Sequence, residues 1–283
     1  MYRGTAESFL SSRAGRNLKG RAQLVLTSPP FPLNRKKQYG NLSGEQYLTW
    51  LGDLAPRIAR SLGESGSLVI EMGNAWESGS PVMSTLGLEA LMLLRKEADL
   101  HLCQQFVCHN PARLPTPIQW VNKDRIRVTD AYTHVWWMSK SVRPKANNRN
   151  VLRPYSARME QLLARGKYND GRRPSGHVIG ASSFLNNNGG SIPSNVLSFS
   201  NTSAANGYRS YCREKGISAH PAAMAPGLAE FFIKFLTDTN DLVFDPFAGS
   251  NTTGAAAEKL GRKWVGVEPD PAYIAGSLGR FGV

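Results

Sequence analysis

Residues Leu242–Gly254 read LVFDPFAGSNTTG. A short apolar run ends at an acidic residue, Asp245, and a glycine turn then leads into a threonine-rich segment that starts a helix. This order is typical of the carboxyl end of a parallel strand, where a tight turn presents groups to a ligand. The stretch therefore predicts an α/β protein with a ligand site at that edge of its sheet.

The turn departs from two common phosphate-binding motifs. A P-loop carries Lys after its second Gly, whereas Ala255 follows Gly254 here, and the GxGxxG dinucleotide fingerprint is absent. The turn instead begins with a carboxylate, Asp245, which suits a ligand that carries positive charge. Glu268 ends the next apolar run, WVGVE, and an acidic residue about 20 positions downstream commonly accepts ribose hydroxyls.

The start of the following helix adds a third group to this site. Backbone N–H groups near Thr252 and Thr253 are free to hold a carboxylate at the helix N-terminus. A ligand that combines an amino group, a carboxylate and an adenosine ribose is S-adenosylmethionine. The pattern indicates this molecule as the cofactor.

A second unusual stretch, TSPPF (Thr27–Phe31), follows the apolar run Ala22–Leu26. Proline does not continue a sheet ladder, so the strand must end here. Taken alone, the stretch fits a plain strand end more often than a site. The functional alternative is a rigid ledge that presents Ser28, the Pro29 carbonyl and Phe31 to a flat ligand.

The rest of the chain alternates strand and helix patterns, which predicts a largely parallel sheet with helices on both faces. Helices are expected at 43–61, at 84–98 with a Ser84 cap, around Leu228–Phe235, at 252–260 and at 270–278. Strands are expected at 22–26, 66–73, 102–108, 132–139, 241–247 and 263–269. The four apolar residues Leu228, Phe231, Phe232 and Phe235 follow helical spacing.

Positive charge dominates the 283-residue chain and gathers in its middle. The formal net charge is +13, and residues 123–175 hold thirteen Lys/Arg but only four Asp/Glu. Such an excess favours a polyanionic partner, nucleic acid before an anionic membrane surface. The middle is also rich in Pro, Gly and Asn, which indicates a loop-rich insert, although a solvated linker has a similar composition. Two apolar segments, VIGASSFL and IPSNVLSFS, are expected to pack within it.

The cysteine pattern gives no sign of a metal or a disulfide framework. Three cysteines are present, an odd count that suits a reducing compartment. His101, Cys103, Cys108 and His109 lie on a strand-like apolar stretch without CxxC, so core cysteine is preferred over zinc. No apolar run is long enough to span a bilayer and the N-terminus lacks a signal-peptide core. We expect a cytoplasmic protein without a metal.

Together the two motifs resemble those of the beta-class amino-methyltransferases of DNA, most closely the cytosine-N4 enzymes of bacterial restriction–modification systems. TSPPF matches the family's (Ser/Asp)-Pro-Pro-aromatic motif, and FDPFAGSNTT matches its cofactor loop. The order is also that of the beta class: catalytic motif early, basic recognition region in the middle, cofactor motif late. YRGTAESFL resembles the adenine-side segment, with Gly4-Thr5 where the family often has Gly-Asp. HPAAMAPGLAEFFIKFLT, 220–237, resembles the segment before the cofactor strand.

The resemblance implies roles for particular residues. Catalysis is assigned to Ser28, Pro29, Pro30 and Phe31. Cofactor binding is assigned to Thr27, His220, Pro221, Asp245, Phe247, Gly249, Ser250, Asn251, Thr252, Thr253 and Glu268. For DNA contact we select Arg35, Lys36, Lys37, Arg172, Arg173 and His177, although the first three also fit an exposed solvated loop. The expected reaction transfers a methyl group from S-adenosyl-L-methionine to the N4 amino group of a flipped cytosine.

The fold implied is a circularly permuted Rossmann-like methyltransferase sheet, mostly parallel with one antiparallel strand, helices on both faces and a loop-rich DNA-recognition insert. If residues 1–3 form the strand beside KWVGVE, the chain ends must lie close together. We expect residues 1–143 to form the catalytic half, 144–216 the target-recognition region and 217–283 the cofactor-binding half. Double-stranded DNA is the expected partner, with no membrane, a monomer or weak dimer, and a cognate restriction endonuclease that acts on the same site without direct contact.

Three other functions stay open at this point. The same fold methylates adenine N6, and Asp more often begins the motif there. Amino-methylation of protein or RNA is disfavoured by the large basic insert. A catalytically inactive nucleic-acid-binding module would be expected to have lost site residues, yet Ser28, Asp245 and Glu268 are present. Carbon-5 methylation is set aside because no Pro-Cys pair exists.

Overall fold

A computed structural model describes residues 1–31, 44–168, 171–180, 183–200 and 205–282 of the chain. The contacts divide it into two compact units, of which the larger contains Met1–Ala146 and Asn195–Val283 and the smaller contains Asn147–Ser194. Each unit is considered by itself. The larger unit carries the main sheet and both sequence motifs.

The main sheet of the described residues has eight strands in the order β1-β10-β9-β2-β3-β5-β4-β8. In this order the strands are Tyr2–Arg3, Lys263–Glu268, Leu242–Asp245, Ala22–Thr27, Leu62–Gly73, Tyr132–Ser139, His101–His109 and Val196–Ser198. Every neighbouring pair is parallel except the two that contain β5, so β5 alone runs against the other strands. The mostly parallel sheet with one antiparallel strand is thereby confirmed.

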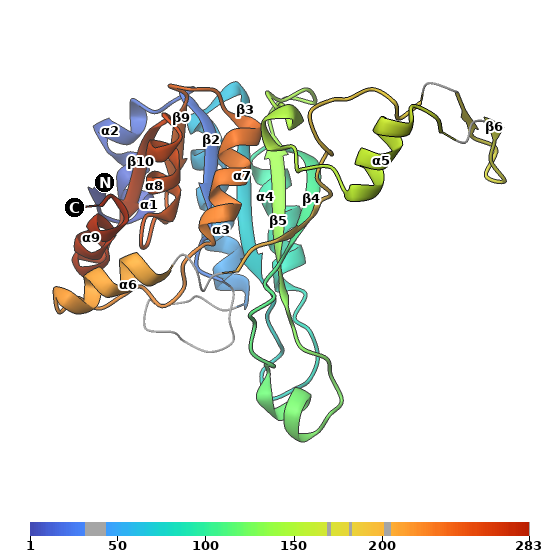
Figure 1. Cartoon of the computed structure of the whole chain (residues 1–283). Helices are drawn as coiled ribbons and strands as arrows, with labels where there is room; N and C mark the ends of the chain where they lie inside the picture. Colours follow the sequence, from blue (N-terminus) through green and yellow to red (C-terminus); the bar gives the residue numbers. More distant parts are fainter. Residues whose placement is uncertain (32–43, 169–170, 181–182, 201–204, 283) are drawn as a thin grey trace. The chain divides into compact units, whose positions relative to one another are not determined.

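The first and last strands of the chain lie side by side, as a permuted sheet requires. β1 pairs in parallel with β10, with Tyr2 opposite Val267 and Arg3 opposite Glu268. Met1 also lies close to the last helix, because the Ser277 hydroxyl is 3.3 Å from its sulfur. The two chain ends are accordingly neighbours (Figure 1). The expected circular permutation is confirmed.

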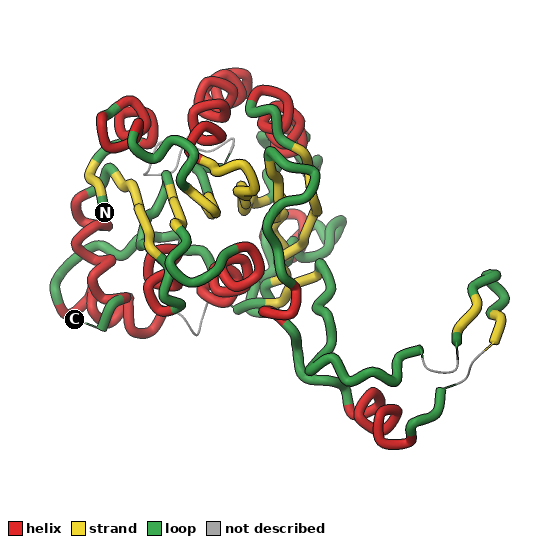
Figure 2. The backbone as a smooth tube through the Cα atoms, turned by 90° about the horizontal axis from the view of Figure 1, so that it is seen from above, coloured by secondary structure: helices red, strands yellow, loops and turns green. Residues whose placement is uncertain are grey.

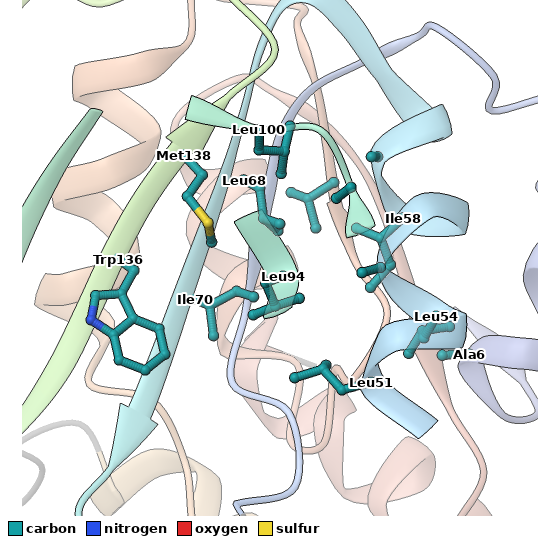
Figure 3. Packing of buried hydrophobic residues seen from close by; sticks show 14 of the residues in the cluster. Ala6, Leu51, Leu54, Ile58, Leu68, Ile70, Leu94, Leu100, Trp136 and Met138 are labelled. Carbon is teal, nitrogen blue, oxygen red and sulfur yellow. The ribbon is translucent and has the colours of Figure 1, made fainter. Parts of the chain in front are cut away.

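One face of the sheet is covered by α1 (Ala6–Ser11), α3 (Gly44–Ser61) and α4 (Leu86–Glu97). Alternate strand residues point to this face, such as Leu68 and Ile70 of β3, and pack with Leu54 of α3 and Leu94 of α4 (Figure 3). Leu54→Ala in this core would lower the free energy of unfolding by about 2–5 kcal/mol. The helix predicted at 43–61 from the spacing of its apolar residues is thus confirmed as α3.

The opposite face is covered by α7 (Pro226–Leu236) and α8 (Thr252–Lys259), so that the strands lie between two helical layers (Figure 2). Val69, which alternates with Leu68 and Ile70, packs into this second core. Leu228 and Phe232 are fully buried there, whereas Phe231 and Phe235 are partly buried at its margin. Helical spacing therefore identified the inward side of α7 correctly.

Two local expectations were wrong. The helix expected from Ser84 begins at Leu86, and its N-cap is Thr85, whose side chain makes no capping hydrogen bond. The Thr85 hydroxyl donates instead to Glu89 at 2.6 Å. The segment IPSNVLSFS does not pack within the insert: its Val196–Ser198 forms β8 and pairs with β4. The edge of β4 would otherwise leave backbone groups unpaired, and β8 satisfies them.

The remaining helices of the larger unit are short. They are α2 (Arg13–Arg16), a π-helical turn at Gln119–Lys123, α6 (Ala205–Glu214), α9 (Pro271–Ser277) and a 3-10 turn at Leu278–Arg280. The smaller unit contains a 3-10 turn at Asn148–Val151, α5 (Ala157–Arg165) and the hairpin of β6 (Gly171–Arg172) and β7 (Val178–Ile179). α5 buries no residue, but Ser156 caps its start and Gly166 closes its end in the left-handed conformation.

Two properties of the described residues concern membranes and metals. No helix among them is both long and apolar enough to cross a bilayer. No three His, Cys, Asp or Glu side chains in the described ranges are grouped as metal ligands. Cys108 is buried in the second core, which is the packing role preferred for it.

Candidate active site

A cavity of about 320 Å³ opens at the carboxyl ends of β2, β9 and β10. We call it the carboxyl-edge cavity. Its lining includes most of the residues selected from the two motifs, which are Ser28, Pro29, Pro30, Phe31, His220, Asp245, Phe247, Gly249, Ser250, Thr252, Thr253 and Glu268. Residues that lie more than 200 positions apart in the chain therefore meet at one site.

Asp245 is the most buried carboxyl group of the cavity, with 4% of the residue exposed. Thr27 Oγ1 donates to its Oδ1 at 2.6 Å and the Phe247 N–H donates to the same oxygen at 3.0 Å. Burial raises the pKa of Asp245 to about 6, although hydrogen bonds from Thr27, Thr253 and Phe247 favour the ionised form. A cation placed beside this carboxylate would offset its burial and hold it ionised.

Glu268 faces the cavity from the end of the adjacent strand. Its Oε2 accepts the Gly249 N–H at 2.9 Å and its Oε1 accepts the Asp270 N–H at 3.0 Å. Burial raises its pKa while these two backbone hydrogen bonds lower it. Each oxygen keeps further lone-pair capacity, so the carboxylate is able to accept two more hydroxyl groups.

The turn between β9 and α8 is held by two residues in the left-handed conformation, Gly249 with φ 50° and Asn251 with φ 58°. Asn251 caps α8 by accepting the Gly254 N–H at 3.2 Å. Asn251 itself does not line the cavity. The Asn251 amide nitrogen and the Thr252 hydroxyl are buried without a hydrogen-bond partner among the described residues. A buried hydroxyl of this kind, at a helix start that faces a cavity, is able to donate to an anionic group.

His220 packs over this turn. A Cβ built on Gly249 would lie 3.2 Å from His220 Nε2, so a larger residue there would displace the ring slightly, and the left-handed φ of Gly249 favours glycine as well. The His220 ring contacts Tyr273 edge to face at 4.5 Å, and its Nδ1 accepts the Ala222 N–H at 3.2 Å. Burial lowers the pKa of His220, which favours the neutral ring. Pro221, selected with it, is exposed and outside the lining.

Aromatic side chains form a wall that the sequence did not indicate. Trp50 of α3 contacts Phe247 at 5.7 Å and Tyr47 at 5.5 Å between ring centroids. The Trp50 indole N–H donates to the carboxylate of Glu7. For Glu7 burial alone would raise the pKa, but hydrogen bonds from Thr5 and Trp50 outweigh it and lower the pKa. Tyr47 and Trp50 have ordinary core spacing on a helix, so only the fold shows that they also line the cavity.

The TSPPF ledge enters the same cavity from β2. β2 ends at Thr27, as the prolines predicted, and Thr27 pairs with Ile70 of β3 in parallel register. The Phe31 ring covers Gly73 at the end of β3, where an added Cβ would lie 2.6 Å from Phe31 Cε2. Thr27 thus contacts Asp245, while the next four residues line the cavity.

Glu71 of β3, a partly buried carboxyl group that lies outside the lining of the cavity, was not identified from the sequence. The printed pairing of β2 with β3 ends at Thr27 and Ile70, so Ser28 and Glu71 each come one residue after this last pair. The Thr133 hydroxyl donates to Glu71 at 3.0 Å. Burial raises the pKa of Glu71 to about 7, although Thr133 and the charge of Arg113 lower it. A carboxyl group that titrates near neutrality beside a candidate site is typical of acid–base chemistry.

Of the six residues selected for DNA contact, three lie in the part of the chain that the structure describes and three lie outside it. Arg172, Arg173 and His177 lie on the β6–β7 hairpin of the smaller unit, where Arg172 and His177 are exposed. The Arg173 N–H donates to the His177 carbonyl at 2.8 Å, and its guanidinium lies 5.8 Å from the Tyr168 ring. Arg35, Lys36 and Lys37 fall outside the described residues.

This geometry defines a class of protein. A permuted, mostly parallel sheet with acidic groups at the ends of adjacent strands β9 and β10, and a Ser-Pro-Pro-Phe ledge in the same cavity, is that of an amino-methyltransferase. The family comparison agrees: the N6/N4 DNA methylase family matches residues 22–278, and the chain belongs to that family.

Individual proteins are similar over nearly the whole chain. The type II methyltransferase M.PvuII of Proteus hauseri is 44% identical over 99% of this chain and 83% of its own length. The solved PvuII DNA methyltransferase, described as cytosine-N4-specific, has a TM-score of 0.78 and 37% identity, covering 99% of this chain and 85% of that one. TTHA0409 of Thermus thermophilus, solved with S-adenosyl-L-methionine, shares the fold with a TM-score of 0.59 at 20% identity, covering 99% and 93%.

Proposed function

We propose that the protein transfers a methyl group from S-adenosyl-L-methionine to the N4 amino group of cytosine in duplex DNA at a specific site. One observation carries the proposal: Ser28–Phe31 and the acidic pair Asp245 and Glu268 line one cavity. Family membership supports DNA as substrate. The name of the similar PvuII enzyme supports cytosine N4.

The residues that line the cavity match the chemical groups of the proposed cofactor one by one. Asp245 would hold the positively charged end, and Glu268 has the lone-pair capacity to accept both ribose hydroxyls. The buried Thr252 hydroxyl and the N-terminus of α8 would hold the carboxylate. The wall of Trp50 and Phe247 supplies flat apolar surface for the adenine ring.

Bound there, the cofactor supplies an electrophilic methyl group, and the ledge prepares the nucleophile. The lone pair of an exocyclic amine is delocalised into its ring. Ser28 Oγ and the Pro29 carbonyl would each accept a hydrogen bond from one N–H group of the amine. These two hydrogen bonds would favour a tetrahedral nitrogen, which exposes the lone pair. The prolines fix the direction of these acceptors, and Phe31 would stack on the base after it has been flipped from the duplex.

Glu71 is the candidate acceptor for the proton that the methylated nitrogen must lose. Methyl transfer would form the N–C bond with the nitrogen lone pair while the bond from the methyl carbon to the sulfonium sulfur breaks and leaves its electron pair on a neutral thioether, so one N–H proton has to leave the nitrogen. Ser28 is a weak base near neutrality, whereas burial raises the pKa of Glu71, the residue after the partner of Thr27 on β3, to about 7. We assign Ser28 to orientation of the amine and Glu71 to proton removal.

The Glu71 assignment predicts a pH dependence. Only the ionised carboxylate takes up a proton, so kcat should fall about tenfold per pH unit below about pH 7 and level off above it. Glu71→Gln should lower kcat by roughly 100-fold and remove this slope. Glu64→Gln, an exposed change on the same strand, is the control. Unchanged kcat and pH profile in Glu71→Gln would limit Glu71 to a packing role.

The product identifies the reaction. Unmethylated bacterial DNA should be incubated with the protein and labelled S-adenosyl-L-methionine, digested to nucleosides and analysed by mass spectrometry. N4-methylcytosine is the expected product. N6-methyladenine would retain the family and the fold but overturn the base assignment, and DNA binding with no methylated base would identify an inactive binding module.

The bacterial relative also bears on the wider setting. We place the protein in the cytoplasm of a bacterial or phage-infected cell, a setting that the bacterial type II relative supports. A type II relative supports a restriction–modification context, in which a nuclease reads the same site without contacting this protein. A monomer or weak dimer is sufficient, because the carboxyl-edge cavity is formed by one chain.

The three regions would divide the work. Residues 1–143 carry the ledge, and 217–283 carry the acidic cofactor groups. Residues 144–216 would read the sequence, with Arg172, Arg173 and His177 presented on the β6–β7 hairpin, and Arg35, Lys36 and Lys37 would contact phosphates.

A further inference from the structure

A long projection extends from the sheet edge that holds the carboxyl-edge cavity. It is made of the loop 74–85, which follows β3, and the loop 110–131, which joins β4 to β5. Both loops leave from the end of β3 at which Phe31 covers Gly73. We call these two loops the arm, and Figure 1 shows it in green and cyan, reaching away from the sheet with a helical turn at its tip.

Side-chain contacts and hydrogen bonds hold the two loops of the arm together. Trp76 of the first loop contacts Trp120 of the second edge to face at 6.4 Å, and the Arg127 guanidinium lies 3.7 Å from the Trp76 ring centroid. Asn74 donates to Asp130 at 2.6 Å across its base. The carbonyl of Trp120 accepts the N–H of residue 126 at 3.0 Å and closes the tip. Such a structure holds its outer side chains in defined places.

Those outer side chains are apolar and exposed. Leu114 is 75% exposed and Val128 is 86% exposed, and Val82, Ile118 and Ile126 are exposed as well. Isolated exposed apolar residues are ordinary, but five on one projection, which we call the patch, are more than an ordinary surface leaves exposed and favour an interaction surface. None of these side chains contributes to either hydrophobic core of the described residues.

Positive charge accompanies the patch. Lys123 and Arg125 are exposed at the tip, and neither forms an ion pair with a residue that the structure describes. Both acidic residues of the second loop are engaged locally, Asp124 by Gln119 at 2.9 Å and Asp130 by Asn74. Arg125 has φ 55°, an uncommon conformation for a residue other than glycine. The loop 110–131 carries four Lys/Arg against two Asp, a net charge of +2, and Glu77 of the loop 74–85 lowers the net charge of the arm to +1.

We infer that the arm is a second DNA-contacting element, which binds the duplex beside the base that enters the carboxyl-edge cavity. The inference rests on the proposed function. Exposed apolar side chains flanked by cations match the surface of proteins that press into the minor groove and separate base steps. Such contact beside the target would stabilise a duplex from which one base has been extracted. Lys123 and Arg125 would bind phosphates, while Leu114 and Val128 contact sugars and base edges.

Two double variants test the inference by separate readouts. Lys123→Gln with Arg125→Gln should weaken binding to a mixed-sequence 40-base-pair duplex and lower the slope of log K against log salt by about 2. Leu114→Ser with Val128→Ser should raise KM for unmethylated bacterial DNA about tenfold. Cofactor affinity, measured by calorimetry, should stay at the wild-type value in both, because neither pair lines the cavity.

Matched controls lie at the opposite edge of the same sheet. β5 runs against the other strands, so the loop after Ser139 emerges there. Val142, 76% exposed, gives the apolar control Val142→Ser, and Arg60→Gln with Arg143→Gln gives the charge control. Both controls should bind and methylate DNA as the wild type does.

The outcomes separate this inference from the proposed function. Wild-type protein that methylates DNA, with arm variants that bind DNA and turn over at wild-type levels, would overturn the role of the arm alone. Wild-type protein that methylates nothing would overturn the proposed function instead. A wild-type dimer that arm variants convert to monomer, with unchanged DNA affinity, would show that a second copy of the chain covers the patch, and would also overturn the inference.

Discussion

Asp245→Asn is expected to weaken the binding of S-adenosyl-L-methionine by about 100-fold or more. Loss of one partner from a buried charge pair costs about 2–5 kcal/mol. Asn keeps the shape of the side chain, and its carbonyl oxygen is still able to accept from Thr27 and Phe247. The fold should therefore survive, which thermal unfolding would verify, and isothermal titration calorimetry measures the affinity.

The wild-type affinity should also depend on pH. The pKa of Asp245 in the free protein is about 6, and a cationic ligand binds the ionised carboxylate. Affinity should accordingly be highest above pH 6 and fall as the pH is lowered through this value. The Asn variant lacks the titrating group and should lose that part of the pH dependence.

The control is Asp241→Asn, at the start of β9 near the opposite edge of the sheet. Asp241 pairs with Lys145 at 2.7 Å, so its loss affects stability without touching the cavity. If Asp245→Asn bound the cofactor with wild-type affinity, the proposal that the Asp245 carboxylate holds the positively charged part of the cofactor would be wrong. Equal losses of affinity in both variants would point to general damage to the fold.

Ser28→Ala is expected to lower kcat by roughly 100-fold, because one preorganised hydrogen-bond partner of the reacting group is removed. Cofactor affinity should stay within about twofold of the wild type, since Asp245 and Glu268 are held by Thr27 and by backbone N–H groups rather than by Ser28. The loss should appear in kcat rather than in KM for DNA, because the contact matters most as the amine becomes tetrahedral.

Single-turnover methylation of unmethylated bacterial DNA measures this step. Ser61→Ala, which removes a buried hydroxyl from the end of α3, is the control and should keep wild-type turnover. Wild-type kcat in Ser28→Ala would exclude the serine from orientation of the amine. The Pro29 carbonyl and Glu71 would then have to account for the chemistry.

Local features of the sequence predicted much of the fold. The prolines of TSPPF ended β2 at Thr27, and the apolar spacing of 228–235 identified the buried side of α7. The glycine turn after Asp245 led into α8 at Thr252 as its motif predicted. These features depend on hydrogen bonds and periodicity within a few residues, so they are readable without the rest of the molecule.

Other features depended on long-range packing. Nothing near Trp50 or Tyr47 distinguishes them from ordinary core residues of α3, yet they form a wall of the cavity. Glu71 sits in a buried strand, and its raised pKa arises from burial against β5. The arm was hidden for the same reason, since Trp76 and Trp120 meet only when β3 and β4 are both paired with β5.

By itself, the sequence determined the alternation of strands and helices, the permuted order of the two motifs and the chemical types of their residues. Only the tertiary structure brought Thr27 to within 2.6 Å of Asp245, because that contact requires β2 and β9 to lie side by side in the sheet. Pairing between strands so distant in the chain is favoured because it lets the helices on both faces of the sheet bury their apolar sides. No local stretch contains that information.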